Sequence, residues 1–318
     1  MHVGPLSDGK QHVTTIPRNT RDESLGARLG RWADEWRQMA AVSLSSSGGP
    51  KAGQIYDIVG TQNLYGEESL FINFGHWKNG PATLDEASRD LARLLARTAD
   101  FNSSDTIVDC GCGYGDQDML WINEFGPEYI TGVNVAAEQV AIATRRVAEA
   151  GLADRISFVN ASATDLPFED ESCTKVVALE SAFHFPSRVD FFAEALRVLQ
   201  PGGLLVTADI VPTRTPLTAL ARREVARRGW RRASRWAVAA AADLAGYRDL
   251  LQCMGFVDVQ TRPITDDVYA PLGRFLTKRL RDADMRHVNP VVRYSFTPLG
   301  FRFATLFSDY IVAVAAKA

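Results

Sequence analysis

The stretch at residues 106–116 reads TIVDCGCGYGD, and it decides how the rest of the chain is interpreted. Ile107 and Val108 are β-branched and apolar, which is typical of the end of a buried strand. The glycines that follow occupy alternate positions, so the backbone can turn sharply and a ligand can approach without obstruction by a Cβ atom. Residues 116–125 then have helical spacing. This strand–turn–helix arrangement predicts a nucleotide-type binding site.

The glycine spacing disfavours two common nucleotide sites. The pattern is Gly-x-Gly-x-Gly, without the Gly-x-x-Gly ending of a dinucleotide site and without the Lys-Ser/Thr of a phosphate loop. An acid, Asp109, stands just before the first glycine instead. The glycine turn alone therefore does not specify the ligand, and the motifs that follow it in the sequence are needed to identify it.

The composition of the 318-residue chain is that of a globular protein. Hydrophobic residues make up 46% and charged residues 23%, and the net charge of -3 gives no reason to expect nucleic acid as a partner. No apolar run approaches the ~18–20 residues needed to cross a bilayer, and the N-terminus lacks the apolar segment of a secretory signal. Cys110 and Cys112 have no second pair or histidine nearby, so no metal site is expected. We therefore expect a cytoplasmic protein without a membrane partner.

From residue 105 onward the sequence alternates between strand and helix patterns, which predicts an α/β fold with βαβ units and a parallel sheet. After the glycine turn, strands are expected at residues 129–134, 156–159, 175–179, 203–209, 256–264 and 310–314. Helices are expected at residues 84–99, 116–125, 136–150, 188–199 and 244–254.

The segments outside this alternation predict the remaining organisation. Residues 1–23 are polar and lack periodicity, as in a mobile tail. Residues 24–100 contain stretches of helical spacing and are expected to form an N-terminal helical cover. Residues 101–318 are expected to form the core, with helical lids at about 212–242 and 266–306.

Asp109 and the alternating glycines resemble the first motif of the class I methyltransferases that depend on S-adenosyl-L-methionine (SAM). In that family the turn wraps the amino-acid part of SAM, and the acid lies near its ammonium group. The resemblance therefore implies that Asp109, Gly111, Gly113 and Gly115 bind SAM. It also implies a Rossmann-like, seven-stranded sheet in which the C-terminal strand, at residues 310–314, joins an antiparallel edge.

Two further segments resemble the cofactor contacts of the family in part. Asn134 ends the second strand, where an acid often binds the ribose hydroxyls; an amide can accept one hydrogen bond and donate another, and the missing acid disfavours NAD. Gln139, one helical turn further on, is either a second amide for SAM or a solvated helix residue. Residues 160–168 (NASATDLPF) resemble the adenine loop, with Ser162 at the usual Asp position and Ala163 beside it.

Residues 179–186 (LESAFHFP) follow the fourth strand and resemble the segment that lies beside the transferred methyl group in relatives. The resemblance implies that His184 is a general base, because a neutral imidazole with a pKa near ~6.5 suits removal of a hydroxyl proton. Asp209, at the end of the fifth strand, is expected to orient His184 or share its proton, and so to raise its pKa. Glu180 is expected to contact either the amino-acid end of SAM or the methyl group.

The order of the motifs most resembles the macrolide-sugar O-methyltransferases of the erythromycin type and their natural-product relatives. The resemblance implies methyl transfer from SAM to a hydroxyl group of a small-molecule acceptor. It also implies that Tyr56, Tyr65 and Trp77 lie in the cover over the active site and bind the acceptor. The alternative for each of these aromatic residues is a place in the core.

A run of arginines between residues 214 and 235 is unexpected for an enzyme whose acceptor is an uncharged sugar. Such a run is usually a solvated helix face, but Arg227 and Arg228, with Trp230 nearby, could also bind an anionic acceptor such as a diphosphate. A C-methyltransferase acting on an isoprenoid or prenylated acceptor and a SAM-binding cyclase that no longer methylates therefore stay open as alternatives. A nucleotide-sugar or NAD-dependent enzyme is disfavoured, and a homo-oligomer stays open.

Overall fold

The computed structural model describes residues 68–281 and 305–318, together with helical residues at 25–26, 29–30, 32–34, 37, 299 and 302. The expected tail at residues 1–23 and the candidate residues Tyr56 and Tyr65 lie outside the described residues. The division of the chain into tail, cover and core therefore stays a prediction.

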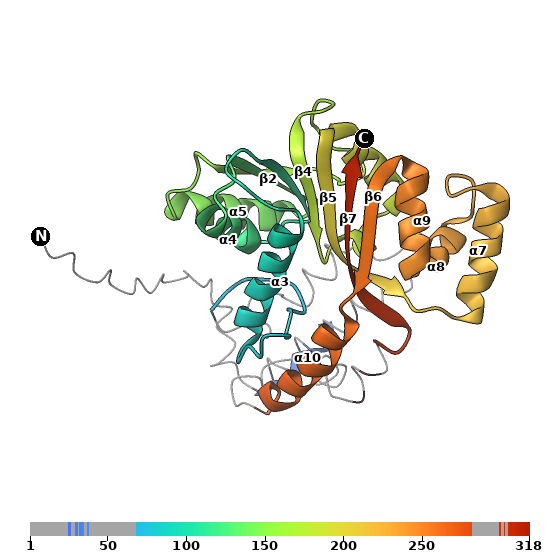
Figure 1. Cartoon of the computed structure of the whole chain (residues 1–318). Helices are drawn as coiled ribbons and strands as arrows, with labels where there is room; N and C mark the ends of the chain where they lie inside the picture. The colour runs from blue at the N-terminus through green and yellow to red at the C-terminus, as the bar shows by residue number, and fades with distance from the viewer. Residues whose placement is uncertain are drawn as a thin grey trace, which may run out of the picture.

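A seven-stranded sheet forms the centre of the protein (Figure 1). Its strands are β1 (Thr106–Cys110), β2 (Tyr129–Asn134), β3 (Ile156–Asn160), β4 (Cys173–Leu179), β5 (Leu199–Pro212), β6 (Phe256–Pro263) and β7 (Ser308–Lys317). The order across the sheet is β3-β2-β1-β4-β5-β7-β6, and β1 to β5 pair in parallel. β7 runs antiparallel to both of its neighbours, which confirms the seven-stranded sheet and its antiparallel edge.

The helices lie where the spacing of the apolar residues predicts them. They are α3 (Leu84–Thr98), α4 (Asp116–Glu124), α5 (Ala137–Glu149), α6 (Arg188–Val198), α7 (Pro216–Arg228), α8 (Arg235–Ala241), α9 (Leu244–Met254) and α10 (Thr265–Arg279). α3 begins at a capping box, in which Thr83 and Glu86 each accept a hydrogen bond from the other's backbone N–H. Within the described part of the chain, no helix combines the length and the apolar character that crossing a membrane requires.

The alternation of side chains along each strand divides the core into two layers. Ile107 of β1 faces the layer formed with α3, α4 and α10, whereas its neighbour Val108 faces the layer formed with α6 and α9. Helices therefore cover both faces of the sheet, as expected for a largely parallel sheet.

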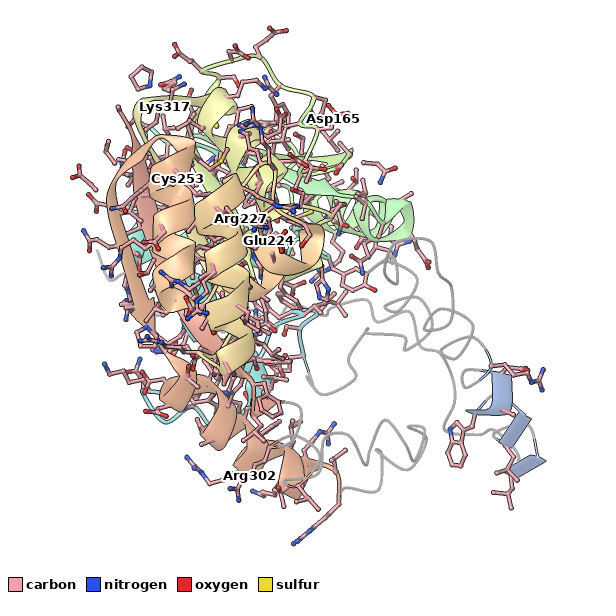
Figure 2. The ribbon with its side chains drawn as sticks, turned by 90° about the vertical axis from the view of Figure 1, so that its right-hand side faces the viewer. Asp165, Glu224, Arg227, Cys253, Arg302 and Lys317 are labelled. Carbon is pink, nitrogen blue, oxygen red and sulfur yellow. The ribbon has the colours of Figure 1, made fainter. Side chains whose placement is uncertain are left out.

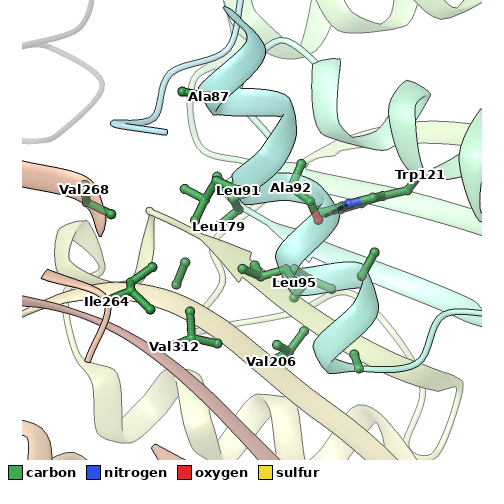
Figure 3. Packing of buried hydrophobic residues seen from close by; sticks show 14 of the residues in the cluster. Ala87, Leu91, Ala92, Leu95, Trp121, Leu179, Val206, Ile264, Val268 and Val312 are labelled. Atoms are coloured by element: carbon green, nitrogen blue, oxygen red, sulfur yellow. Dashed lines mark hydrogen bonds between the residues drawn. The ribbon is translucent and has the colours of Figure 1, made fainter. Parts of the chain in front are cut away.

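Helix α3 occupies the centre of the first layer (Figure 3). Leu91 and Leu95 are fully buried there, in one cluster with Val206 of β5. Trp121 of α4 donates its Nε1–H to the carbonyl oxygen of Ala92 at 2.9 Å, which ties α4 to α3. The segment before the glycine turn is thus an integral part of the core.

Strand β5 begins earlier than the sequence predicts. The strand was expected to begin only at Gly203, the last residue of the Pro201-Gly202-Gly203 segment, but Leu199 already pairs with Cys173 of β4, and the register shifts between Cys173 and Lys175. This irregularity places the Pro-Gly-Gly segment within the start of the strand, where a bulge accommodates such residues.

The expected insertion after β5 consists of α7 and α8. These helices pack on each other through a small cluster of buried residues, Ala221, Val225, Ala237 and Ala241. Figure 1 shows them beside α9, next to the β6 edge of the sheet. Their action as a lid stays a prediction.

Candidate active site

The parallel strands bring the candidate residues to one edge of the sheet. β1 pairs with β2 and β4, and β4 pairs with β5, all in the same direction. Their carboxyl ends therefore lie together, and ligands bind at this edge in sheets of this kind. The glycine turn, Asn134 and Glu180 directly follow or end three of these strands.

Close packing shapes the glycine turn. Gly111 and Gly115 both have positive φ, at 88° and 81°. A Cβ atom on Gly111 would lie 2.3 Å from the Cβ of Ser181, and one on Gly115 would lie 2.7 Å from Cζ of Phe158. At Gly113, by contrast, a Cβ atom would meet only Cδ1 of Ile72, at 3.7 Å. Two glycines are therefore required by the protein's own packing, and the third leaves room for a ligand.

Asp109 lies buried beneath this turn. Its Oδ2 accepts a hydrogen bond from Nε2 of Gln117 at 2.9 Å, and Gln117 also donates to the carbonyl oxygen of Cys112. Its Oδ1 is buried without a donor among the described residues. Burial raises the pKa of Asp109 to about 7, although its neighbours Gln117 and Asp118 lower it.

The amides expected to contact the ribose lie together. Nδ2 of Asn134 donates to Oε1 of Gln139 at 2.8 Å, and Oδ1 of Asn134 accepts from the backbone N–H of Ala136. Both side chains are nearly buried. Gln139 is thus not a solvated helix residue but the partner that orients Asn134.

The expected adenine loop is a tight turn. A bridge joins Ser162 to Asp165, the hydroxyl groups of Ser162 and Thr164 lie 2.8 Å apart, and Ala163 is buried. The Ser162 hydroxyl is therefore held near the carboxyl end of β3.

Glu180 connects three parts of the chain that are distant in sequence. Its Oε2 accepts hydrogen bonds from the backbone N–H of Phe74 at 2.7 Å and from the hydroxyl of Tyr310 at 2.6 Å. Burial raises the pKa of Glu180 to about 8. Its φ of 52° is unusual for a residue other than glycine, and such backbone strain clusters at functional sites. The sequence did not point to Tyr310, which appeared only as the first residue of an apolar strand.

Asp209 pairs with Arg188, a residue that belongs to none of the sequence motifs. The Arg188 Nε and Nη2 atoms donate to the two Asp209 carboxylate oxygens at 2.9 and 3.2 Å, and Nη2 also reaches the carbonyl oxygen of Ile210. Asp209 is fully buried. Its charge is therefore compensated by Arg188, and the direct role expected for it toward His184 stays a prediction.

The expected rise in the pKa of His184 is wrong. His184 ends the short 3₁₀ helix Ala182–His184 and is exposed. Removal of water by the surrounding protein lowers the pKa of His184 to about 4, with Asp209 raising it and Arg188 lowering it further. The imidazole is therefore neutral at neutral pH.

The candidate acceptor residues fall into different environments. Trp77 is in the core: its Nε1–H donates to the carbonyl oxygen of Phe74 at 2.9 Å, and its ring packs on Phe275 of α10. Trp230 is half-buried between the insertion and the core layer of α6 and α9. Arg227 and Arg228 are exposed, and Figure 2 shows Arg227 on α7. Of these residues, only the two arginines are exposed, and Arg228 lies 3.9 Å from a carboxylate oxygen of Glu224 on the same helix.

The fold and this edge define a SAM-dependent methyltransferase of class I. The chain has the strand order of that class, an open position at Gly113, an acid with an unpartnered oxygen beneath the turn and an amide pair at the end of β2. These residues fit SAM, whose ammonium group calls for an acid and whose ribose calls for hydrogen-bonding side chains.

Comparison with known proteins leads to the same class. A family model described as a methyltransferase domain matches residues 108–207. The erythromycin 3''-O-methyltransferase of Saccharopolyspora erythraea is 32% identical over 296 residues, which cover 89% of this chain and 94% of that protein. The chain belongs to the SAM-dependent methyltransferases of the natural-product type, and its cofactor is SAM.

Two solved structures share the fold. The [4+2]-cyclase SpnF matches with a TM-score of 0.64 and 22% identity, covering 83% of this chain and 95% of its own. The geranyl diphosphate C-methyltransferase from Streptomyces coelicolor A3(2) matches with a TM-score of 0.56 and 21% identity, covering 74% of this chain and 82% of its own.

The Arg188–Asp209 pair predicts a large effect on stability. Asp209→Asn leaves the Arg188 charge buried and unpaired, so we expect the free energy of unfolding to fall by about 3–5 kcal/mol in urea titrations. Glu149→Gln is the control, because it removes the exposed pair between Arg145 and Glu149 and should change the value by less than ~1 kcal/mol. Equal effects of the two substitutions would contradict the structural role of the buried pair.

Proposed function

We propose that the protein transfers a methyl group from SAM to a hydroxyl group of a small natural-product acceptor. The observation that carries this proposal is the similarity to an O-methyltransferase along 89% of the chain. SAM supplies an electrophilic methyl group when it is bound. The residues of the chain then have to align the acceptor and take up the hydroxyl proton.

His184 is the residue that we assign to accept this proton. It follows β4 at the carboxyl edge of the sheet, in the segment that also contains Glu180. Because its pKa is lowered to about 4, mainly by loss of water around the ring, the neutral imidazole that can accept a proton predominates at neutral pH. At neutral pH, His184 therefore does not have to lose a proton before it can accept one from the acceptor hydroxyl.

Glu180 has a different role in this proposal. Its carboxyl group holds the segment around Phe74 against the sheet through the Phe74 N–H and the Tyr310 hydroxyl. We assign to it the positioning of this segment over the carboxyl edge, where it excludes water from the reacting groups.

The proposal is tested by incubating the protein with methyl-labelled SAM and a hydroxyl-bearing macrolide. Mass spectrometry and NMR would locate the label, which we expect on oxygen. A label on carbon would favour the C-methyltransferase alternative, and a rearranged acceptor without label would favour the cyclase.

The assignment of His184 predicts a specific pH dependence. We expect His184→Ala to lower kcat by ~10²–10⁴-fold with unchanged SAM affinity, because a positioned base contributes about this much. In the wild type, kcat/KM should rise with pH through a midpoint near the pKa of about 4 and stay level through neutral pH as far as His184 is concerned. Added imidazole should partly restore the variant.

Near-normal turnover of His184→Ala would contradict this assignment. If the midpoint of the pH dependence of kcat/KM lies at or above the ordinary histidine pKa of ~6.5, Asp209 raises the pKa of His184, as the sequence predicts.

For the arginines of α7, we propose contact with an anionic part of the acceptor. Their exposure supports this proposal, as does the ability of Arg to bind phosphate with two hydrogen bonds. Changing Arg227 and Arg228 to Ala should then raise the KM for the acceptor severalfold without changing SAM affinity. Arg145→Ala, on the exposed face of α5, is the control. An acceptor KM equal to that of the control would make the α7 arginines an ordinary solvated surface.

A further inference from the structure

Two carboxyl groups lie next to each other beneath the glycine turn. Asp109 of β1 and Asp118 of α4 are both 0% exposed, and they are close enough that each shifts the pKa of the other. Gln117 supplies one donor, to Oδ2 of Asp109. In residues 68–281 and 305–318, nothing donates to Oδ1 of Asp109 or to either carboxylate oxygen of Asp118. Three buried oxygens are thus left without a hydrogen atom.

The charged groups around this pair do not compensate it. Asp116, in the same turn of α4, is itself negative, and its charge is taken by Arg146, whose Nη1 and Nη2 lie 2.5 and 3.0 Å from its oxygens. Burial raises the pKa of the Cys110 and Cys112 thiols well above their ordinary value, so both are neutral. Within the described part of the chain, no lysine, arginine or histidine forms an ion pair with Asp109 or Asp118.

Two ionised carboxylates in contact and out of water are strongly unfavourable. A single proton removes the conflict between the two charges, because an Asp118 O–H group can donate to Oδ1 of Asp109. Burial, and then the charge of Asp109, raise the pKa of Asp118 well above its ordinary value. Asp118 is therefore the member that keeps the proton, and Asp109 is the member that ionises near neutral pH.

We propose that Asp118 is a neutral acid that donates its proton to Asp109 and so holds Asp109 as the single ionised carboxylate beneath the cofactor turn. Asp118 is then a positioning residue, since it acts on the cofactor through Asp109. The inference rests on the assignment of SAM to this turn. Ionised Asp109 favours the ammonium group of the ligand, so affinity should fall as pH drops below the pKa of Asp109, by up to about tenfold per pH unit.

Variants of similar size at position 118 distinguish a role of Asp118 as a hydrogen-bond donor from a role of its negative charge. An amide can replace a protonated acid as donor, so Asp118→Asn should match the wild type in folding, in affinity for S-adenosylhomocysteine and in the pH midpoint of binding. Asp118→Leu has a similar volume but no donor. Asp109 then loses a hydrogen bond to its ionised form, so the midpoint should move to higher pH and the affinity at neutral pH should fall.

Calorimetric titration with S-adenosylhomocysteine at several pH values measures these effects. The titration of the ligand's own amine is common to all three proteins, so differences between them report on the carboxyl pair. Loss of folding or of tight binding in Asp118→Asn would overturn the proposal, because the charge of Asp118 would then be required. A pH midpoint in Asp118→Leu equal to that of the wild type would overturn it as well.

Infrared spectroscopy observes the proton directly and does not depend on a ligand. The difference spectrum between wild type and Asp118→Asn at neutral pH should contain the carbonyl band of a protonated, buried carboxylic acid. Its absence would show that Asp118 is ionised, which contradicts the proposal. If the band is present but the wild type does not bind S-adenosylhomocysteine, the assignment of the turn as the cofactor site is wrong. The inference that Asp118 is protonated would still hold.

Discussion

Close packing at the turn after β1 is the constraint on which the site depends. Gly111 lies against Ser181, and the Ser181 hydroxyl donates to the carbonyl oxygen of Cys110 at 2.6 Å. The backbone N–H of His184 in turn donates to the carbonyl oxygen of Ser181. A side chain at Gly111 would therefore displace Ser181, and with it Glu180 and His184 on either side. The cofactor turn and the proposed catalytic segment are thus one packing unit.

Of the carboxyl groups buried at this edge, Asp209, Glu180 and Asp109 are each stabilised differently. Asp209 pairs with Arg188, Glu180 accepts hydrogen bonds from the Phe74 backbone and the Tyr310 hydroxyl, and Asp109 has Gln117 and the inferred proton of Asp118. Burial of a charge is energetically costly, so each carboxyl group interacts with a partner from another helix, strand or loop. These partners hold the strand ends in fixed positions, as alignment of a methyl donor and an acceptor requires.

The sequence predicts the parts of this structure that local pattern determines. The helices, the parallel strands and the positive φ values of the turn follow from periodicity and from alternate glycines. The partners of the buried acids do not follow from local pattern. Arg188 lies 21 residues from Asp209, and Tyr310 lies 130 residues from Glu180, so only the fold brings them together.

Local pattern also could not predict the environment of Trp77 or the pKa of His184. An aromatic residue before a helix has the same local pattern in a core as in a pocket, and only packing on Phe275 places Trp77 in the core. The pKa of His184 depends on the water that surrounding elements remove and on Arg188, neither of which the motif contains.

The central claim is that the glycine turn is the cofactor cradle, and the affinity of Gly113→Val for S-adenosylhomocysteine tests it most directly. Gly151→Val is the matched control, because Gly151 also has positive φ, at 70° against 57° for Gly113, and a Cβ atom there meets nothing within 4 Å. We predict that calorimetry finds affinity reduced by about tenfold or more, ~1.4 kcal/mol, for Gly113→Val and unchanged for Gly151→Val. Wild-type affinity in a folded Gly113→Val protein would contradict the account.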